Sequence, residues 1–289
     1  MSFLRFILTL TLVSLCLQST TTSVRAFSLP SLAAAIKEVN DYIDQNNIET
    51  IFNMHNNENS TVVKEVDDAT EAAAVISTTD DSETLVRKEL AVGQYGLDTD
   101  DLITGASWSC LRQAGFKNAA VRVFTSGCFV DLTGVISAKN AANSGYGPVD
   151  VVLVPSLNCT LTPAQQVDAA LAALGQTPFG SLWIEVGNIN SHWLPSPDAN
   201  ALWLFGAVLR SLERVGWSRV GILSSYEGWG NTLRWHSEFF FLKLWYVHHD
   251  GDASFKDFVP FGGWKMPLVK QFIGPTRRCN VKVNLDAII

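Results

Sequence analysis

The chain has 289 residues, of which 47% are hydrophobic, and it contains nine Trp and sixteen Phe. That content is enough for one or two domains with a sizeable core, and it excludes a fully disordered chain. The formal net charge is −7, but the acidic excess is local: residues 27–90 hold 13 acidic and 4 basic residues, whereas residues 91–289 hold 15 of each. A neutral body excludes the broad basic face of a nucleic-acid-binding protein and gives no electrostatic reason to expect binding to a membrane.

The first 26 residues have the layout of a cleaved signal peptide. Arg5 precedes an apolar run over residues 6–17, and the segment ends in the small residue Ala26. The run is shorter than the roughly 20 apolar residues that span a bilayer, which argues against the alternative of a membrane anchor. We therefore expect secretion, or delivery to a lysosome-like or phagosome-like compartment.

Residues 27–90 are predicted to be an acidic, largely flexible extension or pro-segment. Residues 66–89 are rich in small and acidic residues and contain no aromatic residue. Such a composition cannot bury enough apolar surface to offset the entropy of ordering. Only residues 32–43 have the spacing of a short amphipathic helix. The pair Arg87 and Lys88 is either a processing point or an ordinary solvated charge pair.

The cysteine count agrees with export. Cys16 leaves with the signal peptide, and the even number that remains predicts two disulfides in an oxidising compartment. Three connectivities are open, and a zinc site is the alternative, although no Cys-x-x-Cys pair or His at ligand spacing supports zinc. The remaining cysteines are Cys110, Cys128, Cys159 and Cys279.

Two Asn-x-Ser/Thr sequences, at Asn59 and Asn158, are candidate glycan acceptors. The second has Cys159 as its middle residue, so burial beside a disulfide would block it.

From residue 92 onward, short apolar runs alternate with helical segments, which predicts a β/α protein with a parallel sheet. We expect strands at 95–98, 119–124, 149–155, 182–186, 219–223, 242–247, 269–273 and 281–285. We expect helices at 107–114, 134–142, 163–174 and 198–215. Eight strands suit a closed barrel, but the second half has too few helices for a regular one. The predicted fold of residues 91–289 is therefore an irregular TIM-type β/α barrel.

Several polar residues fall in these strands or just after them, where the functional side chains of a parallel barrel project. Glu185, in the stretch LWIEVGN, and Asp98, in YGLDTD, are the first candidates. An acid in a strand that is apolar on both faces must be solvated at a cleft or paired, since burying an unpaired charge is costly. A buried salt bridge or a solvated strand end is the non-functional alternative for Glu185.

Two further patterns have simpler explanations. The run His248-His249-Asp250 has the residue types of a metal site or a catalytic triad, but neighbouring residues on a strand point to opposite faces. No Gly-x-Ser-x-Gly nucleophile turn is present to complete a triad. The aromatic-rich residues 255–264 are either a platform for sugar rings or the closure of one barrel end.

The segment LWYVHHDGDASFKDFVPFGGWKMPLVKQFIG, followed by Cys279 and VKVNLD, closely resembles the last third of the invertebrate and amoebal lysozyme-like proteins of glycoside hydrolase family 25. Upstream, YGLDTD, WSCLRQAGFKNAAVRVF, VDVVLVPSLNC and VGILSSYEGW resemble further strands and the first helix of that family in the same order. The resemblance covers roughly residues 95–289 and leaves the acidic extension unexplained.

The resemblance implies an irregular β/α barrel that cleaves the β-1,4 bond after N-acetylmuramic acid in bacterial peptidoglycan, as a monomer without cofactor or metal. In that family one strand ends in Asp-x-Glu; the Glu protonates the glycosidic oxygen, and the Asp assists the acetamido group of the substrate. Asp98 matches the Asp of the first strand. Glu185 and Glu227 are the other candidate catalytic residues, and the candidate substrate-binding residues are Trp183, Asp150, Tyr246, Trp264 and Asn284.

The chain departs from the family pattern at two positions. With Trp183 aligned on the family Trp, Glu185 stands at the Asp position and Gly187 at the position of the acid Glu. In the last strand the family has Val-Asp-Leu-Asn, and Asn284 here replaces its Asp. Loss of a positioned general acid costs about 10²–10⁴ in rate.

Three arrangements would still supply an acid. In the first, the alignment is shifted by two residues, so that Glu185 is itself the acid. In the second, the side chain of Glu185, which is longer than that of Asp, reaches over Gly187. In the third, Glu227 enters from the end of the neighbouring strand. The sequence thus supports a secreted lysozyme-like hydrolase or, as the alternative, a non-catalytic protein that binds peptidoglycan. A scaffold with neither property is the third possibility.

Overall fold

The structure, a computed structural model, describes residues 93–187 and 192–289. Several expectations therefore lie outside the described residues. These are the signal peptide at 1–26, the acidic segment at 27–90 with its helix at 32–43 and its Arg87-Lys88 pair, and the acceptor Asn59.

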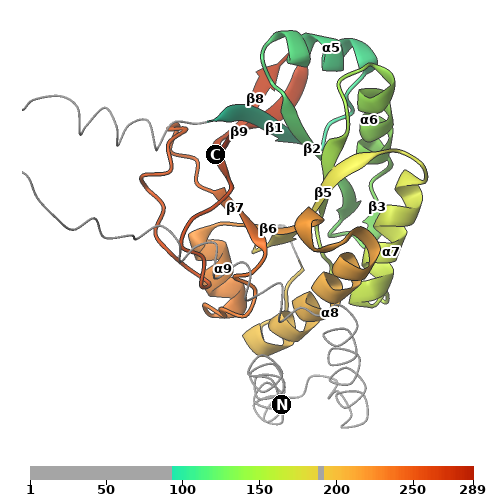
Figure 1. Cartoon of the computed structure of the whole chain (residues 1–289). Helices are drawn as coiled ribbons and strands as arrows, with labels where there is room; N and C mark the ends of the chain where they lie inside the picture. The colour runs from blue at the N-terminus through green and yellow to red at the C-terminus, as the bar shows by residue number, and fades with distance from the viewer. Residues whose placement is uncertain (1–92, 188–191) are drawn as a thin grey trace, which may run out of the picture. The chain divides into compact units, whose positions relative to one another are not determined.

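Eight strands close into a barrel (Figure 1), in the order β1, β2, β4, β5, β6, β7, β8, β9, with β9 paired to β1. The prediction of an eight-stranded barrel is confirmed. A ninth strand, β3 (Phe129–Val130), pairs only with β2 and stands outside the ring. The barrel strands are β1 (Gln94–Thr99), β2 (Asn118–Thr125), β4 (Val149–Leu153), β5 (Phe179–Val186), β6 (Val220–Ser224), β7 (Lys243–Val247), β8 (Val269–Arg278) and β9 (Val281–Ile288).

The sheet is not parallel throughout, and the prediction of a parallel sheet is wrong for β9. This strand runs antiparallel to both β8 and β1. Cys279 and Asn280 join β8 to β9 in a two-residue turn, and both have positive φ, of 50° and 66°. Such a turn matches the twist of a tight antiparallel hairpin. No residues are left there for a crossover helix. This hairpin and the connection 248–268 between β7 and β8, which contains no helix, together explain why the second half of the barrel is short of helices.

Four predicted helices are present, and Figure 1 shows them on the outer side of the ring of strands: α5 (Gly105–Gln113), α6 (Leu132–Asn143), α7 (Pro163–Leu174) and α8 (Pro197–Val215). Helix α7 begins with a capping box in which Thr162 and Gln165 satisfy each other's backbone N–H groups. Helix α8 ends at Gly216, which adopts φ +83°. None of the helices within the described ranges is long and apolar enough to cross a membrane.

A short helix that the sequence did not predict, α9 (Tyr226–Leu233), follows β6. Its eight residues include Gly228 and Gly230, and glycine is a poor helix former, so its periodicity is weak. The hydroxyl of Ser225 accepts a hydrogen bond from the N–H of Gly228 at 2.9 Å and caps the helix. A single 3₁₀ turn, η2 (Trp217–Arg219), precedes β6.

Both predicted disulfides are present, and the structure shows which of the three possible connectivities is adopted. Cys110 of α5 is joined to Cys279 in the turn between β8 and β9, and Cys128 after β2 is joined to Cys159 after β4. Each bond ties segments that are distant in sequence, 169 and 31 residues apart. All four described cysteines are thereby used, so the zinc alternative is wrong.

The acceptor Asn158 lies beside the second disulfide, and its side chain is exposed. Burial therefore does not block this Asn-x-Thr site, contrary to the concern raised by its middle cysteine.

The interior of the barrel is filled by side chains from six successive parts of the ring. Trp183 and Trp245 pack edge to face, with ring centroids 5.3 Å apart. Aromatic pairs in this geometry add about 0.5–1.5 kcal/mol to simple burial. The other buried members of this inner core are Ala120, Val152, Val154, Leu223 and Val269. The interior of the barrel is therefore a packed core.

Candidate functional site

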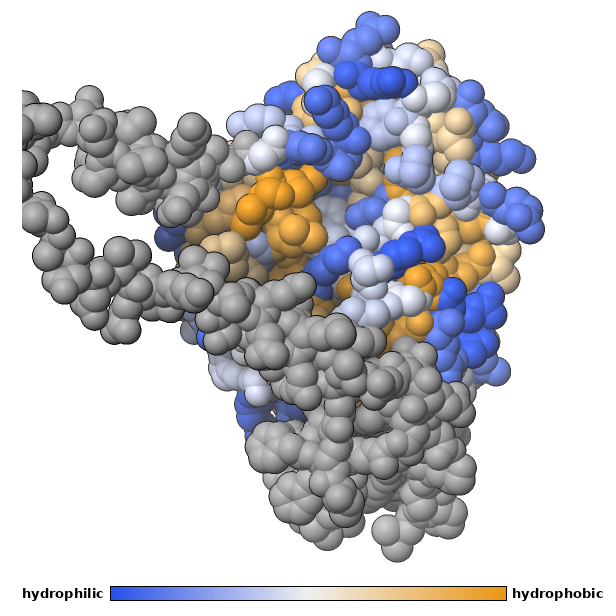
Figure 2. Space-filling model, in the orientation of Figure 1, coloured by the Kyte–Doolittle hydropathy of each residue, from blue (hydrophilic) through white to orange (hydrophobic). Residues whose placement is uncertain are grey.

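The inner core identifies which side chains point into the barrel. Trp183 belongs to it, and residues two apart on a strand share a face, so Glu185 also lies on the inner side, nearer the C-terminal end of β5. The same rule applied to Val269 places Gln271 on the inner side of β8. In the space-filling view, hydrophilic residues lie among hydrophobic ones around the middle of the ring (Figure 2).

Asp98 is the centre of a hydrogen-bond network near the C-terminal end of β1. Its Oδ2 accepts a hydrogen bond from Nε2 of Gln271 at 2.6 Å, and its Oδ1 accepts one from Nδ2 of Asn284 at 2.9 Å. His249 Nε2 lies 2.7 Å from Oε1 of Gln271, which extends the network outward. The amide of Gln271 is thereby oriented with its NH₂ group toward Asp98. The structure thus joins two predicted site residues, Asp98 and Asn284.

A second carboxyl group lies next to this network. Asp286 is two residues beyond Asn284 on the same face of β9, is almost fully buried, and accepts a hydrogen bond from the indole of Trp245 at 3.2 Å. Burial, and then the nearby charge of Asp98, raise the pKa of Asp286 well above its ordinary range. Burial likewise raises the pKa of Asp98 from 3.8 to about 6, against the opposing hydrogen bonds from Asn284 and Gln271.

These two raised values predict how stability depends on pH. A carboxyl group that binds its proton more tightly in the folded state stabilises the fold below its unfolded pKa and loses this contribution as pH rises through the folded pKa. For Asp98 the change from 3.8 to about 6 corresponds to about 3 kcal/mol lost between about pH 4 and pH 7. Asn resembles the neutral form of the acid and does not ionise. As pH rises from about 4 to 7, the free energy of unfolding is therefore expected to fall less in Asp286→Asn than in the parent, as measured by urea unfolding.

The matched control is Asp168→Asn, on the outer helix α7, where the carboxylate pairs with Arg210 at 2.9 Å. Its stability should follow the same pH dependence as the parent between pH 4 and pH 7. If the stability of Asp286→Asn and of the parent changed with pH in parallel, the raised pKa of Asp286 would be contradicted.

The position matched to the family acid is closed by backbone contact. Gly187 directly follows β5 and has φ +80°. A Cβ atom there would lie 2.4 Å from both the carbonyl carbon and the oxygen of Gly228, in the first turn of α9. Glycine is therefore required at this position both by conformation and by close approach. Glu185 remains as the one candidate acid at the end of this strand, and its side chain is half-buried.

Glu227 lies on the neighbouring element, in the first turn of α9, and its side chain is exposed. Its charge contributes to the raised pKa of Tyr246, behind burial and the effects of Asp257 and Asp250. The side chain of Tyr246 is also hydrogen-bonded to Asp257. Glu227 and Tyr246 thus belong to one neighbourhood at the ends of β6 and β7.

The predicted aromatic contacts with substrate are mostly buried. Trp183, Tyr246 and Trp264 are only 2%, 5% and 4% exposed. The indole N–H of Trp183 donates to Oδ2 of Asp150 at 2.7 Å, and that of Trp264 donates to the carbonyl of Leu242 at 2.8 Å. These rings present almost no face to a sugar, so we assign them a packing role.

Asp150 sits near the opposite end of the barrel from Glu185. It is the second residue of β4, and its Oδ1 accepts a hydrogen bond from the backbone N–H of Ser181 at 2.7 Å. Burial raises its pKa, while the hydrogen bonds from Trp183 and Ser181 oppose that rise. Asp150 therefore orients Trp183 within the core.

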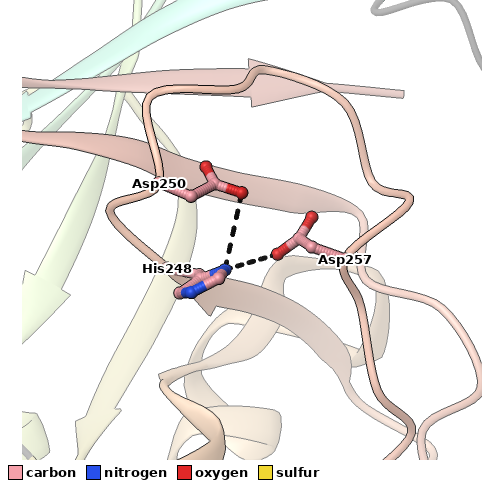
Figure 3. Close-up of side chains that lie close together, drawn as sticks. All are labelled: His248, Asp250 and Asp257. Atoms are coloured by element: carbon pink, nitrogen blue, oxygen red, sulfur yellow. Dashed lines mark hydrogen bonds and ion pairs between the residues drawn. The ribbon is translucent and has the colours of Figure 1, made fainter.

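His248, Asp250 and Asp257 gather just beyond the end of β7 (Figure 3), with Nδ1 of His248 2.6 Å from Oδ2 of Asp257 and 3.6 Å from Oδ2 of Asp250. These residue types can bind a metal ion, but a cation is already present. Nζ of the fully buried Lys270 lies 2.8 Å from Oδ2 of Asp250 and 2.6 Å from Oδ1 of Asp257. We therefore interpret the cluster as a buried ion-pair network and assign no metal to it.

The network fastens residues 248–268 to the barrel. Lys270 belongs to β8, whereas both carboxylates and the carbonyl of Ser254, which accepts a third hydrogen bond from Nζ at 3.0 Å, belong to the long connection before it. Burial alone would raise the pKa of Asp257, but the hydrogen bonds from Lys270 and His248 outweigh it and lower that pKa. His249 points elsewhere, to Gln271, so the two adjacent histidines do diverge as predicted.

Sequence reasoning missed Lys270, Gln271 and Asp286 as parts of the site. Each carries a signal that was available: Lys270 and Gln271 interrupt the apolar strand LVKQF, and Asp286 follows Asn284 at the two-residue spacing of one strand face. A polar residue inside a strand that is otherwise apolar has to find a partner, and these three do.

A closed eight-stranded barrel with carboxyl groups on its inner face near the strand ends is the architecture of a β/α-barrel enzyme. The family model "Lysozyme-like protein 1" matches residues 89–272. The chain is 30% identical over 205 residues to lysozyme-like protein 5 of Caenorhabditis elegans, covering 69% of this chain and 93% of that protein. It is 28% identical over 198 residues to the probable GH family 25 lysozyme 5 of Dictyostelium discoideum, covering 68% and 90%.

Among solved structures, the barrel is similar to the family GH25 lysozyme from Aspergillus fumigatus, with a TM-score of 0.55 at 12% identity, covering 68% of this chain and 93% of that one. At this identity the likeness concerns the fold. Together with the family model, these relatives show that the chain belongs to the lysozyme-like proteins of glycoside hydrolase family 25.

Proposed function

We propose that the protein is a secreted lysozyme-like hydrolase that acts on bacterial peptidoglycan and cleaves the β-1,4 bond after N-acetylmuramic acid. The observation that carries the proposal is Glu185, an acid on the inner side of the barrel at the end of β5, where the family keeps its assisting Asp. The similarity to a relative described as a probable GH family 25 lysozyme supports the substrate class. The signal-like N-terminus and the two disulfides support export, and we propose a monomer.

We assign the roles by the environment of each carboxyl group. Glu185 assists the acetamido group of the substrate in the two-carboxylate scheme. Asp98, whose pKa is raised to about 6, is able to hold a proton in weakly acidic conditions and to donate it to the leaving oxygen; the water that completes hydrolysis then supplies a proton to Asp98 again. Glu227 is exposed in the first turn of α9, next to the C-terminal end of β6, and adds negative charge at this end of the barrel. Hydrolysis should therefore slow as pH rises through about 6 and Asp98 loses its proton.

The direct test is Glu185→Gln, which keeps the shape of the side chain and removes its charge. Release of soluble fragments from purified peptidoglycan is expected to fall by about 10²–10⁴. The matched control is Glu213→Gln on α8, where the carboxylate pairs with Arg210 at 2.6 Å on the outside of the barrel, and its release should equal that of the parent. Undiminished release by the Glu185 variant would remove that residue from the mechanism.

A second candidate function is binding of peptidoglycan without cleavage. The contact between Gly187 and Gly228 favours it, because no side chain fits where the family keeps its proton donor. Such a protein would sediment with insoluble peptidoglycan and release no fragments. Measuring sedimentation and release on the same preparation separates the two functions, since the hydrolase does both and the binding protein only the first.

A further inference from the structure

Helix α9 and the turn after it carry two aromatic rings that the core does not cover. Tyr226, the first residue of α9, is 40% exposed, and Trp235, just beyond its end, is 44% exposed. Their ring centroids lie 4.5 Å apart, and the ring planes are tilted by 50°. We refer to these residues as the Tyr226–Trp235 pair. Adjoining exposed aromatic side chains are a common feature of ligand-binding surfaces.

The backbone holds Trp235 in an unusual conformation. Arg234 and Trp235 are consecutive non-glycine residues with positive φ, of 46° and 65°. Such conformations persist only where surrounding contacts enforce them, and they concentrate at ligand clamps. The contacts here are visible: the indole N–H of the fully buried Trp229 donates to the carbonyl of His236 at 2.9 Å, directly after the strained residues.

The ring of Trp235 also lies against Gly230. A Cβ atom at that glycine would come within 2.3 Å of the indole, so only glycine allows the ring to pack onto the helix. The turn is fixed further by His236, whose Nδ1 lies 3.0 Å from Glu238 and whose Nε2 lies 3.3 Å from Asp198. The exposed ring is therefore positioned in advance, which lowers the entropic cost of binding a ligand.

The pair adjoins the proposed hydrolytic site. Tyr226 lies two residues beyond the end of β6, and its ring centroid lies 5.8 Å from that of Phe261. In the same helical turn, Gly228 touches Gly187 at the end of the strand that carries Glu185. The exposed charged residues Glu227 and Arg234 stand beside the two rings in the chain.

A second aromatic pair shows what distinguishes these rings. Trp217 and Phe241, near the start of β6 and so at the other end of the barrel, stack almost flat on each other, with centroids 4.9 Å apart and planes 22° apart. Flat stacking covers a face of each ring, whereas the tilt of the Tyr226–Trp235 pair leaves ring surface for a ligand.

We propose that the Tyr226–Trp235 pair is a subsite for a β-1,4-linked chain of N-acetylated amino sugars, next to the site where the bond is cut. A pyranose ring has an apolar face of C–H groups that fits an aromatic ring, and its hydroxyl groups meet polar side chains at the edges, here Glu227 and Arg234. The choice of this glycan rests on the proposed function. The subsite holds the chain beyond the reacting sugar.

The test measures binding of the β-1,4-linked tetramer of N-acetylglucosamine to the full chain, by titration calorimetry and by tryptophan fluorescence. Tyr226→Ala and Trp235→Ala are each expected to weaken binding about tenfold or more, while Tyr226→Phe keeps a ring and should keep binding. Trp217→Ala is the matched control at the other end of β6 and should bind like the parent. If Trp235→Ala does not fold, Tyr226→Ala alone decides.

Fragment release from peptidoglycan is recorded for the same proteins, which separates the two proposals. Unchanged tetramer binding in Tyr226→Ala and Trp235→Ala overturns the subsite, even if the parent releases fragments and so proves to be a hydrolase. Weakened binding in both variants supports the subsite, even if the parent releases nothing. A parent that binds neither the tetramer nor peptidoglycan overturns both proposals.

Discussion

Replacing Gly187 with glutamate is expected to destabilise the barrel and not to raise its release of fragments from peptidoglycan. The sequence alone suggests the opposite, because this substitution restores the residue that the family uses as its acid. The structure gives the reason for expecting no gain: Gly187 has φ +80°, and any Cβ atom there would meet the backbone of Gly228 at 2.4 Å. The backbone conformation alone costs about 1–3 kcal/mol in a residue other than glycine. Forcing α9 away from β5 adds about 1–3 kcal/mol more.

Two alanine variants separate these costs. Gly187→Ala carries both the strain and the clash, whereas Gly216→Ala has a nearly identical φ of +83° with nothing within 4 Å of its new Cβ. Urea unfolding should therefore show a larger loss for Gly187→Ala than for Gly216→Ala. Higher fragment release by Gly187→Glu than by the parent would contradict the prediction, and it would show that a carboxylate at position 187 serves as proton donor better than Asp98 does.

Glycine at position 187 is thus required by the packing between β5 and α9. Gly228 faces the same constraint from its side, since a Cβ atom there would lie 2.9 Å from the carbonyl oxygen of Gly187. The two glycines let the first turn of α9 approach the end of β5. That approach places Gly228, which shares the first turn of α9 with Tyr226 and Glu227, next to the end of β5.

The barrel was predictable because each strand is marked by a pattern within its own short stretch of sequence. Short apolar runs bounded by turn residues mark buried strands, and seven of them pair as expected in a parallel sequence. The last strand was misassigned in direction because a two-residue turn with positive φ at Cys279 and Asn280 reads like any other polar connection. Helix α9 could not be predicted from local sequence either, because its glycines are required by contacts with Gly187 and Trp235, which lie outside the helix.

The candidate site was harder to predict because exposure depends on how long loops fold. Residues 255–264 are rich in aromatic side chains, which favours a sugar platform, yet Phe261 and Trp264 are buried against Trp229. No pattern in the sequence marks Trp235 as a site residue, yet in the structure it has a positive φ and is half exposed. Residue type alone therefore could not indicate which aromatic rings are exposed and which are buried.

The loop that buries these aromatics depends on Lys270, and Lys270→Met is expected to destabilise the protein by about 3 kcal/mol at neutral pH. Methionine matches the length of lysine but leaves Asp250 and Asp257 facing each other without the ammonium that lies 2.8 Å and 2.6 Å from them. Removing one partner of a buried ion pair typically costs about 3–5 kcal/mol, and partial exposure of the carboxylates reduces that cost. The loss would appear as a lower midpoint of urea unfolding.

The matched control is Lys282→Met, where the ammonium lies 3.2 Å from Asp100 and the side chain is 47% exposed, so a change of at most about 1 kcal/mol is expected. The pH dependence of stability supplies a second check, and its direction can be predicted. Lys270 lowers the pKa of Asp257, so this pairing stabilises the fold above the unfolded pKa of the acid and is lost as pH falls through the folded one. The gap between parent and Lys270→Met should therefore be widest near neutral pH and narrow in acid. Equal unfolding midpoints for Lys270→Met and Lys282→Met at pH 7 would show that residues 248–268 are held by their aromatic contacts alone.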